Sequence, residues 1–224
     1  MNARNYTYLP IFLDPRGLKV LVIGGGTVGT KRALKFAELM SDVTVVSLDF
    51  STDLQRAYEE KKIKLIKGDA KSLIDDNFLS QYHIIVTATS DRTLNSSICK
   101  VAKILGKLCN DPTNPEESNF IVPIYSIEDS IGVAVTTFGK SSLSSKFILQ
   151  LIKERVLNDE VKKLVEVMGL VKDKMKSEVE DPRRRFSLYS LIFNDPKFRD
   201  YVSKNDIEHS IKRAEEIING YKTD

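Results

Sequence analysis

Short apolar runs alternate with amphipathic segments through the first half of the chain. The runs are typical of buried strands, and the segments between them have the spacing of helices. We predict strands at 19–23, 43–47, 63–66, 84–88 and near 107–109, and helices at 28–40, 51–61, 71–80 and 92–105. This alternation predicts an α/β fold with a parallel sheet and helices on both faces. Ligands of such folds bind where the strands end.

The pattern changes after residue 110. Residues 110–115 are rich in turn formers. Two apolar runs follow, at 120–125 and 131–137, with Glu128, Asp129 and Ser130 between them. They are predicted to be antiparallel strands. From Ser142 onward the apolar residues recur at helical spacing, and only helices are predicted.

The helix predicted after Ser142 carries a continuous apolar stripe. Its members are Leu143, Phe147, Ile148, Leu151 and Ile152. Such a stripe is usually part of a core. Since the preceding β segment is short and offers little surface, a partner subunit is an alternative cover for this stripe.

A glycine-rich turn, Gly24-Gly25-Gly26-Thr27-Val28-Gly29, lies between the first predicted strand and the first predicted helix. A dinucleotide site requires this order of strand, turn and helix. Gly24 permits the tight turn, Gly26 lets the backbone approach a diphosphate, and Gly29 lets the helix pack close to the strand. Free N–H groups at the helix start then face the phosphates. The turn therefore predicts a nucleotide site.

Two further segments follow predicted strands at the same edge of the sheet. Asp49 lies 20 residues beyond Gly29, where the fingerprint places an acid that binds a ribose. If Asp49 reaches the ribose, its charge repels a 2′-phosphate and favours NAD over NADP. The alternative is that Asp49 begins a turn with its charge in water. The loop 87–91 is small and polar, and it either borders a cofactor or caps the next helix through Ser90 or Asp91.

Composition narrows the class of protein. The chain has 224 residues, 42% hydrophobic and 29% charged, with a net charge of +3, so no general affinity for nucleic acid is indicated. No apolar stretch approaches the ~20 residues of a membrane span. Residues 1–10 lack a secretory apolar region, and we expect a cytoplasmic protein. Cys99 and Cys109 offer no disulfide framework, and His83 and His209 form no zinc pattern, so no metal site is predicted.

In these motifs and their order, the chain resembles the precorrin-2 dehydrogenase/sirohydrochlorin ferrochelatase family. This family also forms the N-terminal module of siroheme synthases. The similar segments occur in the family's order and spacing. They are 9–12, 22–29, 87–91 with Asn95, 109–110, 120–123, 136–142, 183–186 and 193–195. The chain ends before any methyltransferase domain, so we expect the free-standing form.

The resemblance implies NAD-dependent oxidation of precorrin-2 to sirohydrochlorin in siroheme biosynthesis. Some members of the family also insert ferrous iron, so the resemblance implies Fe²⁺ as a further candidate substrate. It implies a homodimer with an NAD-binding Rossmann domain at 1–112, a β dimerisation and substrate segment at 113–145, and a helical domain at 146–224. The predicted cofactor-binding residues are Gly24, Gly26, Thr27, Val28, Gly29, Leu48, Asp49, Thr89 and Asn95.

The chain departs from the family at one acid. The family has an aspartate between its Cys-Asn pair and its Phe-Ile-x-Pro, and the ungapped position before Phe120 is Thr113. Either a shifted loop presents Asp111 there, or Thr113 hydrogen-bonds the substrate or a water. A third interpretation is that Asp111 only stabilises its own turn. Asp111 and Thr113 are thus the catalytic candidates, and the departure weakens the case for metal insertion more than for oxidation.

The substrate carboxylates require donors. Thr137, Lys140 and Ser141 form a polar turn at a predicted helix N-terminus, which suits an anion, or they cap that helix. The run 183–185 supplies three arginines, which either bind carboxylates or form a solvated face. The alternative function is a non-catalytic NAD(H)- or tetrapyrrole-binding module, because a fold alone does not fix a function.

Overall fold

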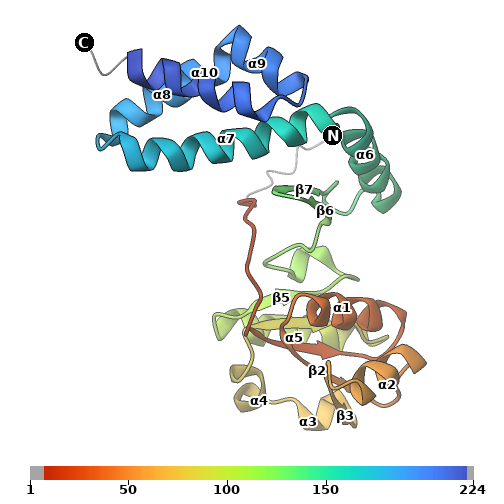
Figure 1. Cartoon of the computed structure of the whole chain (residues 1–224). Coiled ribbons are helices and arrows are strands. Elements are labelled where there is room, and N and C mark those ends of the chain that lie inside the picture. The colour runs from red at the N-terminus through yellow and green to blue at the C-terminus, as the bar shows by residue number, and fades with distance from the viewer. Residues whose placement is uncertain (1–7, 221–224) are drawn as a thin grey trace, which may run out of the picture. The chain divides into compact units, whose positions relative to one another are not determined.

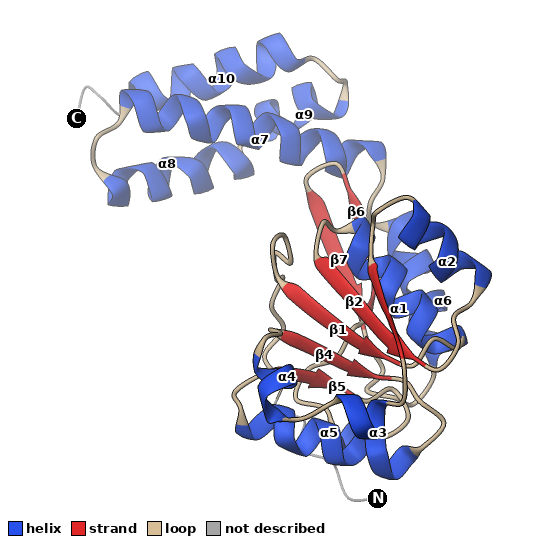
Figure 2. Cartoon of the chain, turned by 90° about the horizontal axis from the view of Figure 1, so that it is seen from below, coloured by secondary structure: helices blue, strands red, loops and turns tan. Residues whose placement is uncertain are grey.

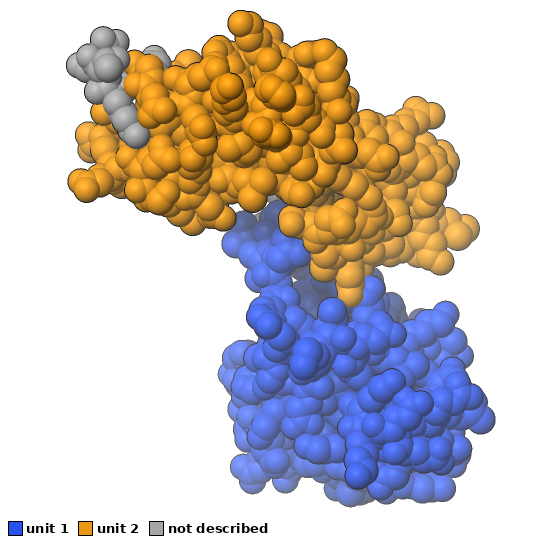
Figure 3. All heavy atoms as spheres, in the orientation of Figure 1, with its two compact units in different colours: residues 1–122 blue, residues 123–224 orange. Residues whose placement is uncertain are grey.

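The computed structural model describes residues 8–220 and separates into two compact units, Met1–Val122 and Pro123–Asp224 (Figure 3). The separation falls after Val122, because Phe120 and Val122 pack against the core of unit 1. The domain boundaries after residues 112 and 145 remain predictions. Part of the segment examined for a secretory signal, 1–7, and the end of the predicted helical domain, 221–224, lie outside the described residues.

Unit 1 is built on a five-stranded parallel sheet in the order β3-β2-β1-β4-β5. Figure 2 labels β2, β1, β4 and β5 in this order. This sheet confirms the predicted fold class. The chain fills one side of β1 first and then crosses to the other side, so the order reverses between β1 and β4. The strands are β1 Lys19–Ile23, β2 Asp42–Ser47, β3 Lys64–Lys67, β4 Ile84–Thr87 and β5 Leu108–Asn110.

Alternate strand residues feed two hydrophobic cores, one on each face of the sheet. Val20 and Val22 point toward α1 and α2, whereas Leu21 and Ile23 point toward α3, α4 and α5. The helices are α1 Thr27–Glu38, α2 Thr52–Glu59, α3 Ala70–Leu73, α4 Asp76–Ser80 and α5 Arg92–Ile104, and the short 3₁₀ helix η1 is Pro115–Glu117. Such double coverage explains why the central strands β1 and β4 are almost entirely apolar.

One predicted helix is divided. The segment 71–80 forms α3 and α4, because Ile74 adopts an extended conformation with ψ of 109°. Asp75 then caps the second helix by accepting a hydrogen bond from the Phe78 amide at 2.8 Å. A side chain that caps a new helix competes with continuation of the old one.

Unit 2 contains an antiparallel hairpin and five helices among the described residues (Figure 1). The hairpin is shorter than predicted, since 120–122 belongs to unit 1. Helices α7 to α10 enclose a core that includes Val171, Leu188, Ile192 and Phe198. The elements are β6 Ile124–Glu128, β7 Ile131–Val135, α6 Ser142–Arg155, α7 Asp159–Glu178, α8 Pro182–Asn194, α9 Pro196–Ser203 and α10 Ile207–Gly220.

Helix α6 packs along the hairpin but leaves much of its apolar stripe uncovered. Leu149 is buried, whereas Leu143 is 75% exposed and Phe147 is 64% exposed. The hairpin itself has only two strands. We call Leu143, Phe147 and Ile148 the α6 face.

Glu128 joins the hairpin to two helices. Its carboxylate oxygens lie 2.8 Å from Lys153 Nζ of α6 and 3.0 Å from Lys162 Nζ of α7. Hydrogen bonds from these two lysines lower the pKa of Glu128 from 4.5 to about 2. The carboxylate therefore remains ionised in the folded protein at pH values where a free glutamate is protonated.

This ion pair predicts an acid-dependent contribution to stability. Because the folded-state pKa lies below the unfolded value, the contribution is complete above about pH 4.5 and disappears as the pH falls toward 2. We expect Glu128→Gln to unfold at a lower temperature than the wild type at neutral pH, with a difference that shrinks toward about pH 3. Circular dichroism melts measure this. Glu208→Gln, at an exposed position of α10, is the control. A difference that does not vary with pH would contradict the expectation.

Candidate cofactor and substrate site

The glycine turn passes between the ends of β2 and β4. The Gly24 amide donates to the Val46 carbonyl at 2.8 Å, and the Gly25 amide donates to Ser47 Oγ at 2.9 Å. Gly24 has φ of 109°, and a Cβ there would lie 2.5 Å from the Ala88 carbonyl oxygen. Only glycine fits this position. The turn thus lies where the strand order reverses, which is the ligand crevice of open α/β sheets.

Gly29 has the packing role predicted for it, and the space at Gly26 is consistent with the predicted approach of a diphosphate. A Cβ on Gly29 would overlap the Gly24 carbonyl oxygen, so α1 and the turn are in direct contact, whereas a Cβ on Gly26 would meet nothing within 4 Å. Gly26 precedes α1 and supplies no side-chain cap. The first amides of the helix, at exposed Thr27 and Val28, are thus open to an anion. The residues present fit a dinucleotide.

The acid after β2 lies beside this turn but points into solvent. The backbone oxygen of Asp49 is adjacent to Gly25. Its carboxylate is 92% exposed and lies 3.5 Å from Lys67 Nζ. Leu48 is also exposed. Contact of Leu48 and Asp49 with the cofactor remains a prediction.

The loop after β4 is held by a buried amide. Thr89 Oγ1 donates to Asn95 Oδ1 at 2.6 Å, and Asn95 Nδ2 donates back to the Thr89 carbonyl at 3.1 Å. Asn95 is fully buried, so any contribution it makes to cofactor binding acts through Thr89. Asp91 caps α5 by accepting from the Leu94 amide at 3.0 Å. A hydrogen bond from Lys71 lowers the pKa of Asp91.

The structure brings the two catalytic candidates together. Asp111 is fully buried, and its Oδ1 accepts hydrogen bonds from the Thr113 amide at 2.8 Å, the Thr113 hydroxyl at 2.7 Å and the Asn114 amide at 3.1 Å. This is the turn-stabilising arrangement considered for Asp111. Its Oδ2, and Oδ1 of Asn110, are buried without a partner among the described residues. Such acceptors are uncommon in proteins and mark a place for a donor.

The expectation for the cysteines was wrong. Cys99 of α5 and Cys109 of β5 form a disulfide with a Cα–Cα distance of 5.4 Å, and both are buried. Sequence spacing did not reveal it, because the two cysteines meet only when α5 packs back onto the strand that follows it. Cys109 directly precedes Asn110 and Asp111. The disulfide therefore ties α5 to the strand that carries the candidate acid.

The polar turn before α6 is occupied by capping bonds. Thr137 Oγ1 donates to the Ser141 carbonyl at 2.8 Å and accepts from the Ser141 amide at 3.0 Å. Ser141 Oγ accepts from the Ser144 amide at 3.0 Å, as a helix N-cap does. Lys140 is exposed. Substrate binding by these residues remains a prediction, with Lys140 as the least occupied donor.

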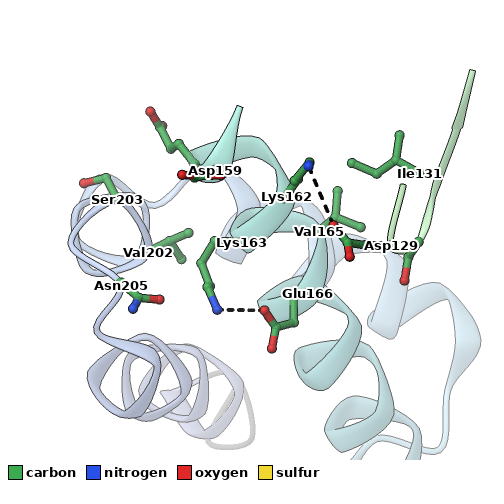
Figure 4. A pocket seen from close by; sticks show the side chains of 12 residues that line it. Asp129, Ile131, Asp159, Lys162, Lys163, Val165, Glu166, Val202, Ser203 and Asn205 are labelled. Carbon is green, nitrogen blue, oxygen red and sulfur yellow. Dashed lines mark hydrogen bonds and ion pairs between the residues drawn. The ribbon is translucent and has the colours of Figure 1, made fainter. Parts of the chain in front are cut away.

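Unit 2 also has a hollow of about 650 Å³ (Figure 4). Its two lysines already have acidic partners, since Lys163 lies 2.8 Å from Glu166 and Lys162 lies 3.9 Å from Asp129. None of the predicted site residues lines it, and we assign it no ligand. The lining residues are Asp129, Ser130, Ile131, Asp159, Glu160, Lys162, Lys163, Val165, Glu166, Val202, Ser203 and Asn205.

Within residues 8–220, His, Cys, Asp and Glu side chains form no group of three or more that could hold a metal ion. A bilayer-spanning helix is likewise not found there, because none of the described helices is both long and apolar enough.

Comparison with known proteins places unit 1 in a family. Residues 11–124 match a family model described as "Putative NAD(P)-binding". In the solved structure titled "SirC, precorrin-2 dehydrogenase", the fold is similar with a TM-score of 0.66, covering 93% of this chain and all of that one at 20% identity.

Sequence relatives extend the similarity along the chain. A "Putative precorrin-2 dehydrogenase" of Methanocaldococcus jannaschii is 32% identical over 88% of this chain and 95% of its own length. The "Precorrin-2 dehydrogenase" of Methanosarcina barkeri is 25% identical over 98% and 97%. A "Siroheme synthase" of Photorhabdus laumondii is 24% identical over 93% of this chain but only 43% of its own length.

The parallel sheet and the glycine turn define an NAD(P)-binding protein of the Rossmann class, as the matching family model shows. Similarity over nearly the whole length of the Methanocaldococcus protein narrows the class further. The chain belongs to the precorrin-2 dehydrogenase family, which confirms the resemblance seen in its motifs.

Proposed function

We propose that this protein oxidises precorrin-2 to sirohydrochlorin in siroheme biosynthesis, with NAD⁺ as the electron acceptor. The proposal is supported chiefly by the open amides of the glycine turn in a chain that aligns with dehydrogenases over nearly its whole length. The reaction removes two hydrogens from the macrocycle, one as a hydride and one as a proton. When bound, NAD⁺ supplies the hydride acceptor.

Different residues around the glycine turn would bind different parts of the cofactor. The first amides of α1 would bind the diphosphate, and Asp49 would bind the ribose once it turns from Lys67. Thr89, fixed by Asn95, would border the reacting end. In that orientation the negative charge of Asp49 would repel a 2′-phosphate, so we propose a preference for NAD over NADP.

The Asp111–Thr113 pair provides a route for the proton. Thr113 is exposed, and its hydroxyl donates to Asp111 Oδ1 at 2.7 Å. Thr113 can accept the substrate proton while passing its own proton to Asp111, so that one proton ends on the carboxyl group. This relay combines the two alternatives offered by the sequence. It accounts for a threonine at the position where the family has an acid.

The relay predicts the effect of an isosteric change. Asp111→Asn keeps an oxygen that can accept the three loop hydrogen bonds but removes the base, and we expect kcat to fall by roughly 100-fold or more. The NADH dissociation constant should not change. Steady-state kinetics and fluorescence titration measure the two quantities.

Thr113 supplies the matched controls. Thr113→Ser retains the hydroxyl and should retain activity, whereas Thr113→Val breaks the relay and should lower kcat. Unchanged kcat in Asp111→Asn would show that Asp111 serves only its own turn.

The function itself is tested with purified protein, precorrin-2 and NAD⁺ under anaerobic conditions. We expect NADH to appear together with sirohydrochlorin, and more slowly with NADP⁺. Fe²⁺ is then added as a substrate, and conversion to siroheme would assign the ferrochelatase reaction as well. Folded protein that binds NADH but forms none from precorrin-2 would contradict the proposal and leave a non-catalytic binding module.

We also propose that a second copy of the chain covers the α6 face. A two-stranded hairpin is marginally stable alone, and the neighbouring α6 face exposes Leu143 and Phe147. A symmetric pair would bury the same surface twice. Light scattering should give the mass of a dimer, and Phe147→Glu should give a monomer. A monomeric wild type would contradict this assignment.

A further inference from the structure

Arg32 of α1 is a half-buried cation that has no hydrogen bond or ion pair among residues 8–220. Burial lowers the pKa of its guanidinium, and no acid opposes that shift. Arginines removed from water are otherwise paired, because leaving their charge unpaired costs free energy. An unpaired guanidinium in the folded chain therefore requires an explanation.

Arg32 lies in the second turn of α1, close in sequence to the glycine turn. It follows Val28 by four residues and Gly29 by three, so it lies one turn further along the same flank. Helical side chains lean back toward the N-terminus, which here is the start of α1. Thr30 lies on the opposite flank, where its hydroxyl contacts Ser51 Oγ at 2.9 Å. Arg32 is thus on the side away from α2.

A second cation strengthens the field on this flank. Lys35 lies one turn beyond Arg32, and burial, followed by the charge of Arg32, lowers the pKa of its amine, while Glu38 opposes the shift. Like charges one turn apart repel each other in a helix. The charge of Arg32 therefore disfavours the charged form of Lys35. An anion would relieve this repulsion.

We propose that Arg32 binds an oxyanion of a ligand at the mouth of the glycine turn. Two ligands can supply one, namely the cofactor diphosphate and a carboxylate of the substrate. The assignment of Arg32 to a substrate carboxylate rests on the proposed function. A guanidinium is suited to both because its forked donors match two oxygens. The first amides of α1 would serve the diphosphate under the proposed function, which favours a substrate carboxylate as the partner of Arg32.

Binding by the variant Arg32→Met tests this in the full chain without turnover. One probe is NADH, whose binding is measured by its fluorescence. The other is uroporphyrin, a stable octacarboxylate tetrapyrrole, whose binding is measured by quenching of its own fluorescence. We expect the dissociation constant of uroporphyrin to rise about tenfold or more, with that of NADH unchanged. A rise for NADH alone would assign Arg32 to the diphosphate. No change in either constant, or no uroporphyrin binding by the wild type with NADH unaffected, overturns the proposal.

Two comparisons separate binding from a structural role. Arg32→Met removes an unpaired charge, so its melting temperature should equal or exceed that of the wild type. A lower melting temperature with unchanged binding would show that Arg32 only packs. Lys31→Met removes a neighbouring, exposed charge and should bind both probes normally. An equal loss of uroporphyrin affinity in Lys31→Met would show that the effect comes from net charge alone, and it would overturn the proposal. Absence of precorrin-2 turnover alters none of these outcomes.

Discussion

Replacing Gly26 with alanine should weaken NADH binding by roughly tenfold or more, because an added methyl group at a close contact costs about 1–3 kcal/mol. The free protein has room for the methyl group, since a Cβ on Gly26 meets nothing within 4 Å. The backbone at Gly26 has φ of −74°, which alanine adopts without strain. We therefore expect a normal melting temperature together with a loss of affinity. Calorimetric titration with NADH and a thermal melt measure the two effects.

Gly29→Ala is the contrasting variant. Its Cβ would overlap the Gly24 carbonyl oxygen, so α1 must move away from the turn. Stability and NADH affinity should both fall. If Gly26→Ala bound NADH as tightly as the wild type, the diphosphate would not approach this turn, and the assignment of the cofactor site would be wrong.

Removing the Cys99–Cys109 disulfide should lower the free energy of unfolding by roughly 3 kcal/mol, the chain-entropy value for a loop of this size. The two cysteines are ten residues apart. For a unit of this size the melting temperature should fall by about 10 °C. Both sulfurs lie in the core beneath α5, so serine at either position adds a polar group there and increases the loss.

The same chain supplies the control for this change. A reductant should lower the melting temperature of the wild type and leave the Cys99→Ser, Cys109→Ser double variant unaffected. Alkylation of denatured, unreduced protein should add no label. Two labels per chain in protein taken from cells with thiols trapped would show that the cysteines are reduced there. That result would agree with the predicted cytoplasmic location, which remains a prediction.

The sequence predicted the sheet well because its strands are covered on both faces. Residues 20–23 and 84–86 are apolar without interruption, and such runs are typical of strands buried on both faces. The pattern gave no means to place 120–122, an equally apolar segment that packs against unit 1 instead of extending β6. Its partner surface comes from distant residues, and periodicity does not reveal which core a segment joins.

The candidate site was predictable where geometry follows from local sequence. The roles of Gly24, Gly26 and Gly29 depend on a single strand, turn and helix. The structure agrees with the tight turn at Gly24 and the close packing at Gly29, whereas approach of a diphosphate to Gly26 stays a prediction. Hydroxyls at a helix start either bind a ligand or cap the helix, and only the structure showed that Thr137 and Ser141 form the capping turn of α6. The same holds for Arg32, because the absence of a partner for a buried charge depends on its spatial neighbours.

The strand order of unit 1 has a consequence for redesign. Residues that would select the cofactor follow β2, and residues that would face the reacting ring follow β4, with β1 between them. The glycine turn contacts both groups, since it bonds Val46 on one side and lies against Ala88 on the other. Exchanging Leu48 and Asp49 for residues that accept a phosphorylated ribose should therefore retarget the enzyme toward NADP⁺ while its tetrapyrrole chemistry stays intact.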